Sequence, residues 1–191
     1  MNDGAFTGTR SARMQGVLFG VIAFIAVGLR VGDINAADDT TLMVGFEEFG
    51  AIRIGMTDKQ AMRAYGPGLK VRPINQELES NECYVLHDPA RLPYTEIWVW
   101  DHRIVGFMVG ERRAKTFSGI GIGDEIAKVQ SVYGDRIKIE PSHYDGMRAP
   151  DIWLRSSDGR NALRFQTENG KVRAILAGTV DAVSRVEGAC L

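Results

Sequence analysis

The sequence has little of several things on which the chemistry of small proteins often depends. Its 191 residues include only two cysteines and three histidines, and its formal net charge is −1. Two cysteines are too few for a disulfide-rich scaffold or a four-thiolate metal site. A charge near zero excludes a strongly basic nucleic-acid-binding protein. With 45% hydrophobic and 25% charged residues, the composition predicts a globular fold rather than disorder.

The sequence also lacks the motifs of common catalytic and cofactor sites. No Gly-Lys-Ser/Thr follows the glycine-rich stretch Gly119–Gly123, and neither a serine nucleophile elbow nor a zinc-binding helix occurs. His87 and Asp88 are adjacent, as are Asp101 and His102, and neighbours on a strand point to opposite faces. We therefore expect a protein that is not an enzyme, holds no metal or cofactor and binds no nucleic acid.

The first 37 residues have the pattern of a secretory signal peptide. Two arginines precede the apolar stretch Met14–Leu29, and small residues follow at Ala36 and Ala37. The predicted location is periplasmic or secreted. The alternative is an uncleaved leader that anchors the chain in the inner membrane, although the stretch is shorter than the ~20 residues of a spanning helix. Membrane contact is expected only through such a leader.

An internal repeat follows. Phe49–Pro73 aligns with Phe117–Pro141 at an offset of 68 residues and without a gap. Phe49, Ile52, Ile54, Gly55, Tyr65, Gly66, Lys70 and Pro73 recur as Phe117, Ile120, Ile122, Gly123, Tyr133, Gly134, Lys138 and Pro141. A fixed spacing of this kind predicts repeated structural units. We predict two tandem copies, at residues 46–112 and 114–180, followed by a C-terminal tail at 181–191.

Each copy has the pattern of an α+β unit. A short helix is predicted after Gly55 and Gly123, with Thr57 or Asp124 as its N-cap and a glycine at its end. Alternating apolar residues then predict an antiparallel meander, and Asn169-Gly170 is typical of a hairpin turn. The predicted strands are Leu69–Arg72, Cys83–His87, Thr95–Trp100 and Arg103–Val109, then Ile137–Glu140, Asp151–Arg155, Ala162–Thr167 and Lys171–Ala177.

The motif Ile52-x-Ile54-Gly55-Met56-Thr57, with Tyr65-Gly66 after a short helix, resembles a known module. It resembles the start of the SmpA/OmlA family of outer-membrane assembly lipoproteins and, in tandem, the β-lactamase inhibitor protein superfamily. The tandem arrangement is closer to the inhibitor type, and the missing cysteine at the predicted cleavage site separates the chain from the lipoproteins. The resemblance implies helices on one face of an antiparallel sheet and a second face that binds a protein partner. It assigns no contact residue.

The two cysteines predict one disulfide in an exported chain. Cys83 lies in a predicted strand of the first copy, and Cys190 lies beyond the second copy. A bridge between them would close a loop of about 108 residues, which the chain-entropy treatment values at roughly 4–5 kcal/mol. The pairing would tie the C-terminal tail to the first copy.

Comparison of the copies separates the two faces of the predicted sheet. Trp98 and Trp100 align with Gln166 and Glu168, so they are expected on the face opposite the core. The same reasoning adds Trp153, with His87 and Arg155 beside it. This cluster is either an exposed ligand-binding face or a set of aromatic residues buried between the copies or under the tail.

These features predict an exported, non-enzymatic protein-binding module, either inhibitor-like or an accessory of envelope assembly. The expected partner is a protein of the cell envelope or the exterior. The alternative is a glycan- or small-ligand-binding protein that uses the aromatic face, and an enzyme is the third hypothesis.

Overall fold

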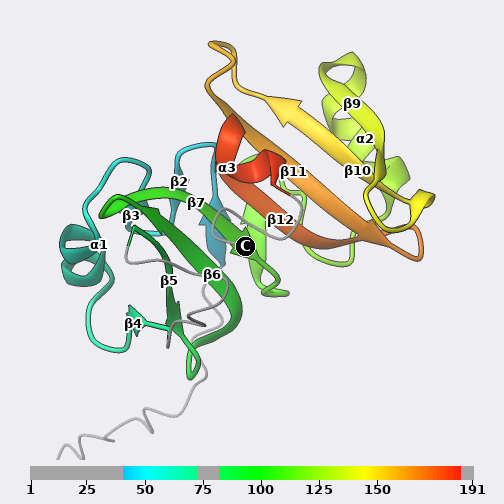
Figure 1. Cartoon of the computed structure of the whole chain (residues 1–191). Helices are drawn as coiled ribbons and strands as arrows, with labels where there is room; N and C mark the ends of the chain where they lie inside the picture. The colour runs from blue at the N-terminus through cyan, green and yellow to red at the C-terminus, as the bar shows by residue number, and fades with distance from the viewer. Residues whose placement is uncertain (1–40, 73–81, 186–191) are drawn as a thin grey trace, which may run out of the picture. The chain divides into compact units, whose positions relative to one another are not determined.

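The structure is a computed structural model that describes residues 41–72 and 82–185 (Figure 1). The described chain has an α+β fold in which strands dominate and three short α-helices occur. The predicted signal peptide at residues 1–37 lies outside the described residues. Among the described residues, none of the helices has the length and apolarity that spanning a membrane requires.

An eight-stranded antiparallel sheet forms the centre of the fold (Figure 1). All eight predicted strands are present, and β7 has the predicted bounds, whereas β10 begins at Gly146 rather than Asp151. In spatial order the strands are β4 (Lys70–Val71), β5 (Cys83–Asp88), β6 (Leu92–Trp100), β7 (Arg103–Val109), β12 (Lys171–Thr179), β11 (Asn161–Glu168), β10 (Gly146–Arg155) and β9 (Ile137–Ser142).

A second, four-stranded sheet was not predicted. Its strands are very short, and the parallel pair β1–β8 joins residues far apart in the sequence, with Leu42 opposite Ala114. In spatial order they are β3 (Ile52–Arg53), β2 (Glu48–Phe49), β1 (Leu42–Val44) and β8 (Ala114–Thr116). We refer to β1–β7 as the first half of the chain and β8–β12 as the second half.

Helix α1 (Asp58–Tyr65) begins as predicted. Thr57 is its N-cap, and a capping box forms because the Thr57 hydroxyl accepts from Gln60 N while the Gln60 side chain accepts from Thr57 N. The helix ends at Gly66, whose φ of 91° is accessible to glycine without a steric penalty.

The predicted N-cap of helix α2 (Ile126–Tyr133) is wrong by one residue. Glu125 occupies the N-cap position, and Asp124 instead accepts hydrogen bonds from Gly121 N and Lys128 Nζ. Burial raises the pKa of Asp124, but these two hydrogen bonds and the charge of Lys128 hold it below the usual value. The 3₁₀ turn η1 (Gly134–Arg136) follows the helix.

Several backbone contacts recur at a spacing of 68 residues. Gly55 N donates to Ile104 O at 2.8 Å, and Gly123 N donates to Val172 O at 2.8 Å. The register of β6 against β7 shifts after Trp98, and that of β11 against β12 shifts after Gln166. Both halves therefore attach the segment before the helix to the last strand of the meander in the same way.

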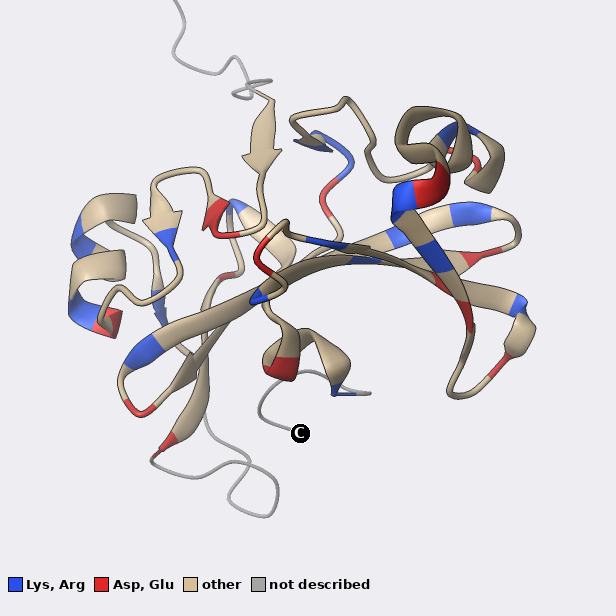
Figure 2. Cartoon of the chain, turned by 90° about the horizontal axis from the view of Figure 1, so that it is seen from above, with Lys and Arg blue, Asp and Glu red and all other residues tan. Residues whose placement is uncertain are grey.

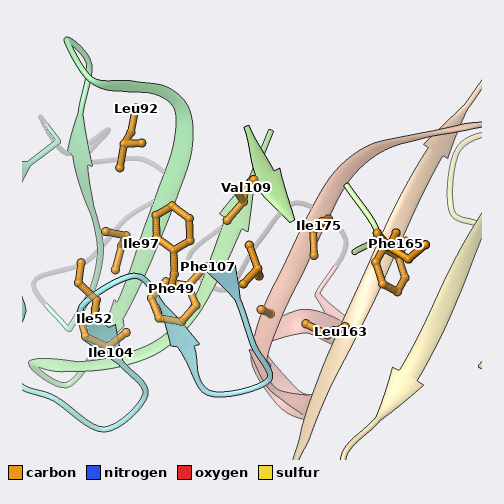
Figure 3. Close-up of a cluster of buried hydrophobic side chains, with 14 of the residues drawn as sticks. Phe49, Ile52, Leu92, Ile97, Ile104, Phe107, Val109, Leu163, Phe165 and Ile175 are labelled. Atoms are coloured by element: carbon orange, nitrogen blue, oxygen red, sulfur yellow. The ribbon is translucent and has the colours of Figure 1, made fainter. Parts of the chain in front are cut away.

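The main hydrophobic core lies on the face of the eight-stranded sheet that carries α1 and α2, between the sheet and these two helices. Side chains of both halves belong to it, among them Phe49 and Phe107 of the first half and Leu163 and Phe165 of the second (Figure 3). This cluster also contains Tyr84, Leu86, Ile152 and Leu154.

Two glycines lie opposite each other where the halves join. β7 pairs with β12 so that Gly106 faces Gly178. A Cβ atom on Gly178 would lie 2.4 Å from Val105 O and 2.5 Å from Gly106 Cα, both of which are backbone atoms. A Cβ atom on Gly106 would lie 2.8 Å from a ring carbon of Trp98. At Gly178 the halves therefore approach too closely for a side chain unless the backbone shifts, and at Gly106 the Trp98 ring occupies the space.

We predict that Gly178→Ala lowers the free energy of unfolding by about 2–4 kcal/mol, because steric overlap adds to an unfavourable φ of 142°. Urea denaturation of the full chain measures this. Gly170→Ala is the matched control, since its φ is 77° but its Cβ meets no atom within 4 Å, and it should cost only about 1–2 kcal/mol. Equal losses of unfolding free energy in the two variants would show that the junction of β7 with β12, which we call the seam, tolerates a methyl group.

Candidate functional site

The face of the eight-stranded sheet opposite α1 and α2 carries helix α3 (Val180–Ser184), and we call it the α3 face. The sheet curves toward this side (Figure 2). The residues of α3 overlap the start of the predicted C-terminal tail at 181–191, of which residues 186–191 lie outside the described ranges. Thr179 caps the helix by accepting from Ala182 N at 3.3 Å.

A second hydrophobic cluster fills the middle of the α3 face. Ala182 and Val183 of α3 belong to it together with Trp98, which is 1% exposed. The other buried members are Cys83, Val85, Ala162, Ala174 and Leu176. Trp98 is thus no part of an exposed ligand face, and of the two alternatives for it, burial at the seam or under the tail fits. The alternation of side chains predicts the face of Trp98 but not what covers that face.

The other two tryptophans lie at the borders of this cluster. Trp100 is 42% exposed, and the guanidinium carbon of Arg185 lies 5.1 Å from its ring centroid. Trp153 is half-buried, with the Arg164 guanidinium 5.1 Å from its ring. Because β6 and β10 are four strand spacings apart, roughly 19 Å separates Trp98 from Trp153. The three rings therefore do not form one platform.

His87 and Arg155, the other predicted binding residues, lie in different halves of the sheet. His87 is half-buried in β5, and its Nε2 has no hydrogen-bond partner among the described residues. Burial, followed by the charges of Lys70 and Arg72, lowers the pKa of His87. Arg155 is exposed on β10. The structure does not bring these two side chains together.

A buried ion pair on the α3 face was missed by the sequence analysis. Arg164 Nη2 donates to Asp151 Oδ2 at 2.6 Å, and the two side chains are 7% and 6% exposed. Opposite charges on neighbouring predicted strands of the same face were the available signal. Burial at this depth makes the pair a conspicuous feature, because charges rarely leave water without a compensating partner.

Arg164 also holds α3 against the sheet. Its Nη1 donates to Val183 O at 3.0 Å and to Arg185 O at 3.2 Å, at the end of the helix. Its Nε is buried and has no hydrogen-bond partner among the described residues. One guanidinium therefore joins a carboxylate of β10 to the main chain at the end of α3, and its Nε is left without a partner in the part of the chain that the structure describes.

A cavity of about 420 Å³ lies beside this ion pair. Arg164 and Asp151 border it, Leu176 supplies apolar surface, and the 67%-exposed Tyr144 stands at its rim. Arg173 also lines the cavity and donates to the Gln166 side chain at 3.0 Å. Its walls thus offer hydrogen-bond donors, acceptors and an aromatic ring. In the described parts of the chain, no group of His, Cys, Asp and Glu side chains suits a metal ion.

A second polar cluster occurs in the first half, at the start of α1. Tyr84 Oη donates to Asp58 Oδ2 at 2.8 Å and lies 3.1 Å from His102 Nδ1. Burial and the Asp58 carboxylate raise the pKa of Tyr84. Because Asp58 N also donates to His102 O, this cluster fastens the β6–β7 turn to the helix. Its three side chains come from separate elements, which explains why adjacency in sequence did not indicate it.

We predict that Arg164→Met lowers the free energy of unfolding by about 3–5 kcal/mol, because it leaves the Asp151 carboxylate buried without its partner. Chemical denaturation provides the measurement. Arg160→Met removes an arginine from an exposed ion pair with Asp158 and should change stability by no more than about 1 kcal/mol. A loss in Arg164→Met no larger than in this control would show that the buried pair does not hold α3.

Comparison with known proteins identifies no family for this chain. No protein family and no curated protein matches it. Among solved structures, the uncharacterized protein yfeY from Escherichia coli matches with a TM-score of 0.44 and 12% identity, covering 73% of this chain and 99% of that one. So distant a match carries no functional argument.

Proposed function

We propose that the chain consists of two tandem α+β copies and acts as an exported, non-enzymatic module that binds a protein partner through its α3 face. The recurrence of sequence and of backbone hydrogen bonds at an offset of 68 residues supports the duplication. The resemblance of the Ile-x-Ile-Gly-Met-Thr motif to the inhibitor superfamily supports a binding role.

The observation that carries the proposal is the state of the polar groups on the α3 face. The two buried side-chain atoms found without a hydrogen-bond partner among the described residues are His87 Nε2 and Arg164 Nε. Buried polar atoms without partners are rare in folded proteins, and each calls for an explanation. The positions of His87 and Arg164 on β5 and β11 put both on the α3 face. A partner that displaces the side chains covering these two atoms and supplies an acceptor or donor there would satisfy them.

The borders of the α3 face are suited to such contacts. Trp100 is partly exposed beside the Arg185 guanidinium, and the largely exposed Tyr144 lines the cavity together with Arg164 and Arg173. Tryptophan, tyrosine and arginine commonly dominate binding energy at protein interfaces. The cavity beside Arg164 provides a recess that a partner's side chain fills. Export places the partner in the envelope or outside the cell.

Site-specific photo-crosslinking tests the interface. We predict that p-benzoylphenylalanine in place of Tyr144 or Trp100 yields the same discrete protein adduct in the native host, because both positions border the α3 face. Val132, which is 38% exposed on α2, is the control position and should give no such adduct. Arg173→Glu should reduce the adduct at position 144 about tenfold by reversing a charge in the cavity. Adducts of equal yield at position 132, or none at all, would refute the assignment.

The polar cavity supports a second candidate function, the binding of a small polar ligand such as a glycan. Its volume of about 420 Å³ is within the range of ligand pockets, and its walls offer both donors and acceptors. Tyr144, rather than the three tryptophans, would then provide the stacking surface. Binding of a sugar that is abolished by Arg173→Glu, without any protein adduct at positions 100 and 144, would favour this function.

We also propose the disulfide between Cys83 and Cys190. Cys83 is buried on the α3 face, and Cys190 lies outside the described residues. We predict that the exported chain contains no titratable thiol unless it is reduced, and that Cys190→Ser lowers the free energy of unfolding by roughly 4–5 kcal/mol relative to the oxidised chain. Thiol titration and urea denaturation measure the two effects. Two reactive thiols in the native, exported chain would contradict the pairing.

A further inference from the structure

A second cavity lies on the side of the eight-stranded sheet that carries α1 and α2, opposite the α3 face. Its volume is about 350 Å³, and it is bordered by the segment Val44–Glu48, the loop after β8 and the end of α2. Its apolar walls include Leu154 and Leu163, each 3% exposed, which belong to the main core. A ligand that enters the cavity from the surface would therefore contact side chains of the hydrophobic core.

Phe117 lines this cavity and is 65% exposed. The residue 68 positions earlier, Phe49, is 2% exposed and packs against Phe107 at 6.0 Å between ring centroids. The same residue type at matching positions is thus part of the core in one half and exposed beside a cavity in the other. Exposing a phenylalanine ring to water forgoes the free energy that its burial would provide.

Hydrogen bonds hold Phe117 in its exposed position. Thr116 N donates to Ile120 O at 2.7 Å, and Gly119 N donates to Thr116 O at 2.8 Å, which closes a tight turn. The Thr116 hydroxyl accepts from Ile120 N and lies 2.9 Å from Tyr133 Oη, which joins the turn to α2. The exposure of the ring is therefore imposed by a well-bonded turn.

The absence of a side chain at Gly45 leaves room for the ring. A Cβ atom at that position would lie 3.0 Å from Phe117 Cε2. The Phe117 ring therefore lies against Gly45, on the border of the cavity, and presents apolar surface to a ligand that enters the cavity.

The charged side chains that line the cavity differ in whether they have an ion-pair or hydrogen-bond partner. Glu48 pairs with Arg53 at 3.1 Å, and Glu47 accepts from Asn161 Nδ2 at 2.8 Å. Arg136 lies over the Tyr133 ring at 5.5 Å, and no carboxylate within the described ranges pairs with it. The positive charge available to a ligand is therefore that of Arg136.

We propose that this cavity binds a small amphiphilic anion, an aryl or short acyl carboxylate whose apolar body lies against Phe117, Leu154 and Leu163 while its carboxylate pairs with Arg136. The cavity volume is at the lower end of the range for small-molecule sites, which limits the ligand to one or two rings or a short chain. The site is independent of the α3 face, and its ligand needs no protein partner.

Photolabelling of the full-length chain with 4-benzoylbenzoate tests the site, because the position of the label is read by peptide mass spectrometry. We predict saturable labelling of residues 44–53 and 116–136, prevented by excess 4-phenylbutyrate. The matched cation, 4-(aminomethyl)benzophenone, should label these segments about tenfold less at equal concentration, since it has the wrong charge for Arg136.

Three variants distinguish the site from general apolar labelling. Phe117→Ala should raise the half-saturating concentration of the anion at least about tenfold, and Arg136→Gln should raise it about two- to fivefold without affecting the cation. Tyr94→Ala removes another exposed aromatic ring, 69% exposed on β6, and should have no effect. Labelling that is absent from these segments, insensitive to Phe117→Ala, or stronger with the cation would overturn the proposal.

Discussion

The antiparallel pairing of β7 with β12 is the constraint from which the arrangement of both faces follows. The pairing places Gly106 opposite Gly178 and merges two four-stranded meanders into one sheet. Because side chains alternate along a strand, a shift of one residue at this seam would exchange the faces of every strand on one side of it. The register at two glycines therefore decides that Trp98 and Arg164 share a face with α3, and that Phe107 and Phe165 share the opposite face.

The two faces combine apolar and polar groups differently. On the face opposite α3, helices α1 and α2 cover a continuous core to which both halves contribute. The cavity beside Phe117 interrupts this core near its border. On the α3 face, a smaller cluster is bordered by the Arg164–Asp151 pair and by a polar cavity. Arg164 serves both regions, because it bonds the end of α3 and also lines the cavity. A ligand that contacts Arg164 in that cavity therefore touches the same guanidinium that holds α3 over the second hydrophobic cluster.

The elements that were predictable from sequence are those that depend on neighbouring residues. The bounds of β7, the turn at Asn169-Gly170 and the glycines after α1 and α2 follow from alternation and from backbone conformations that few residues adopt. Helix α3 has only five residues, too few for a periodic pattern, and its docking depends on Arg164 from another strand. The parallel β1–β8 pair likewise has no local signal. Neither cavity was predictable, because each is bordered by loops and strands that only the folded chain brings together.

The seam also determines how many open edges the large sheet has. Two separate meanders would have four outer strands, and the union of β7 with β12 leaves β4 and β9. β4 has two residues, both exposed, and begins with a lysine. β9 contains Pro141, which cannot donate a backbone hydrogen bond, and the ion pair of Lys138 with Glu140. Short, charged or proline-containing edge strands are the features by which natural sheets resist strand addition by other chains. Joining the halves thus removes two sites of aggregation, and the remaining two are poor templates for it.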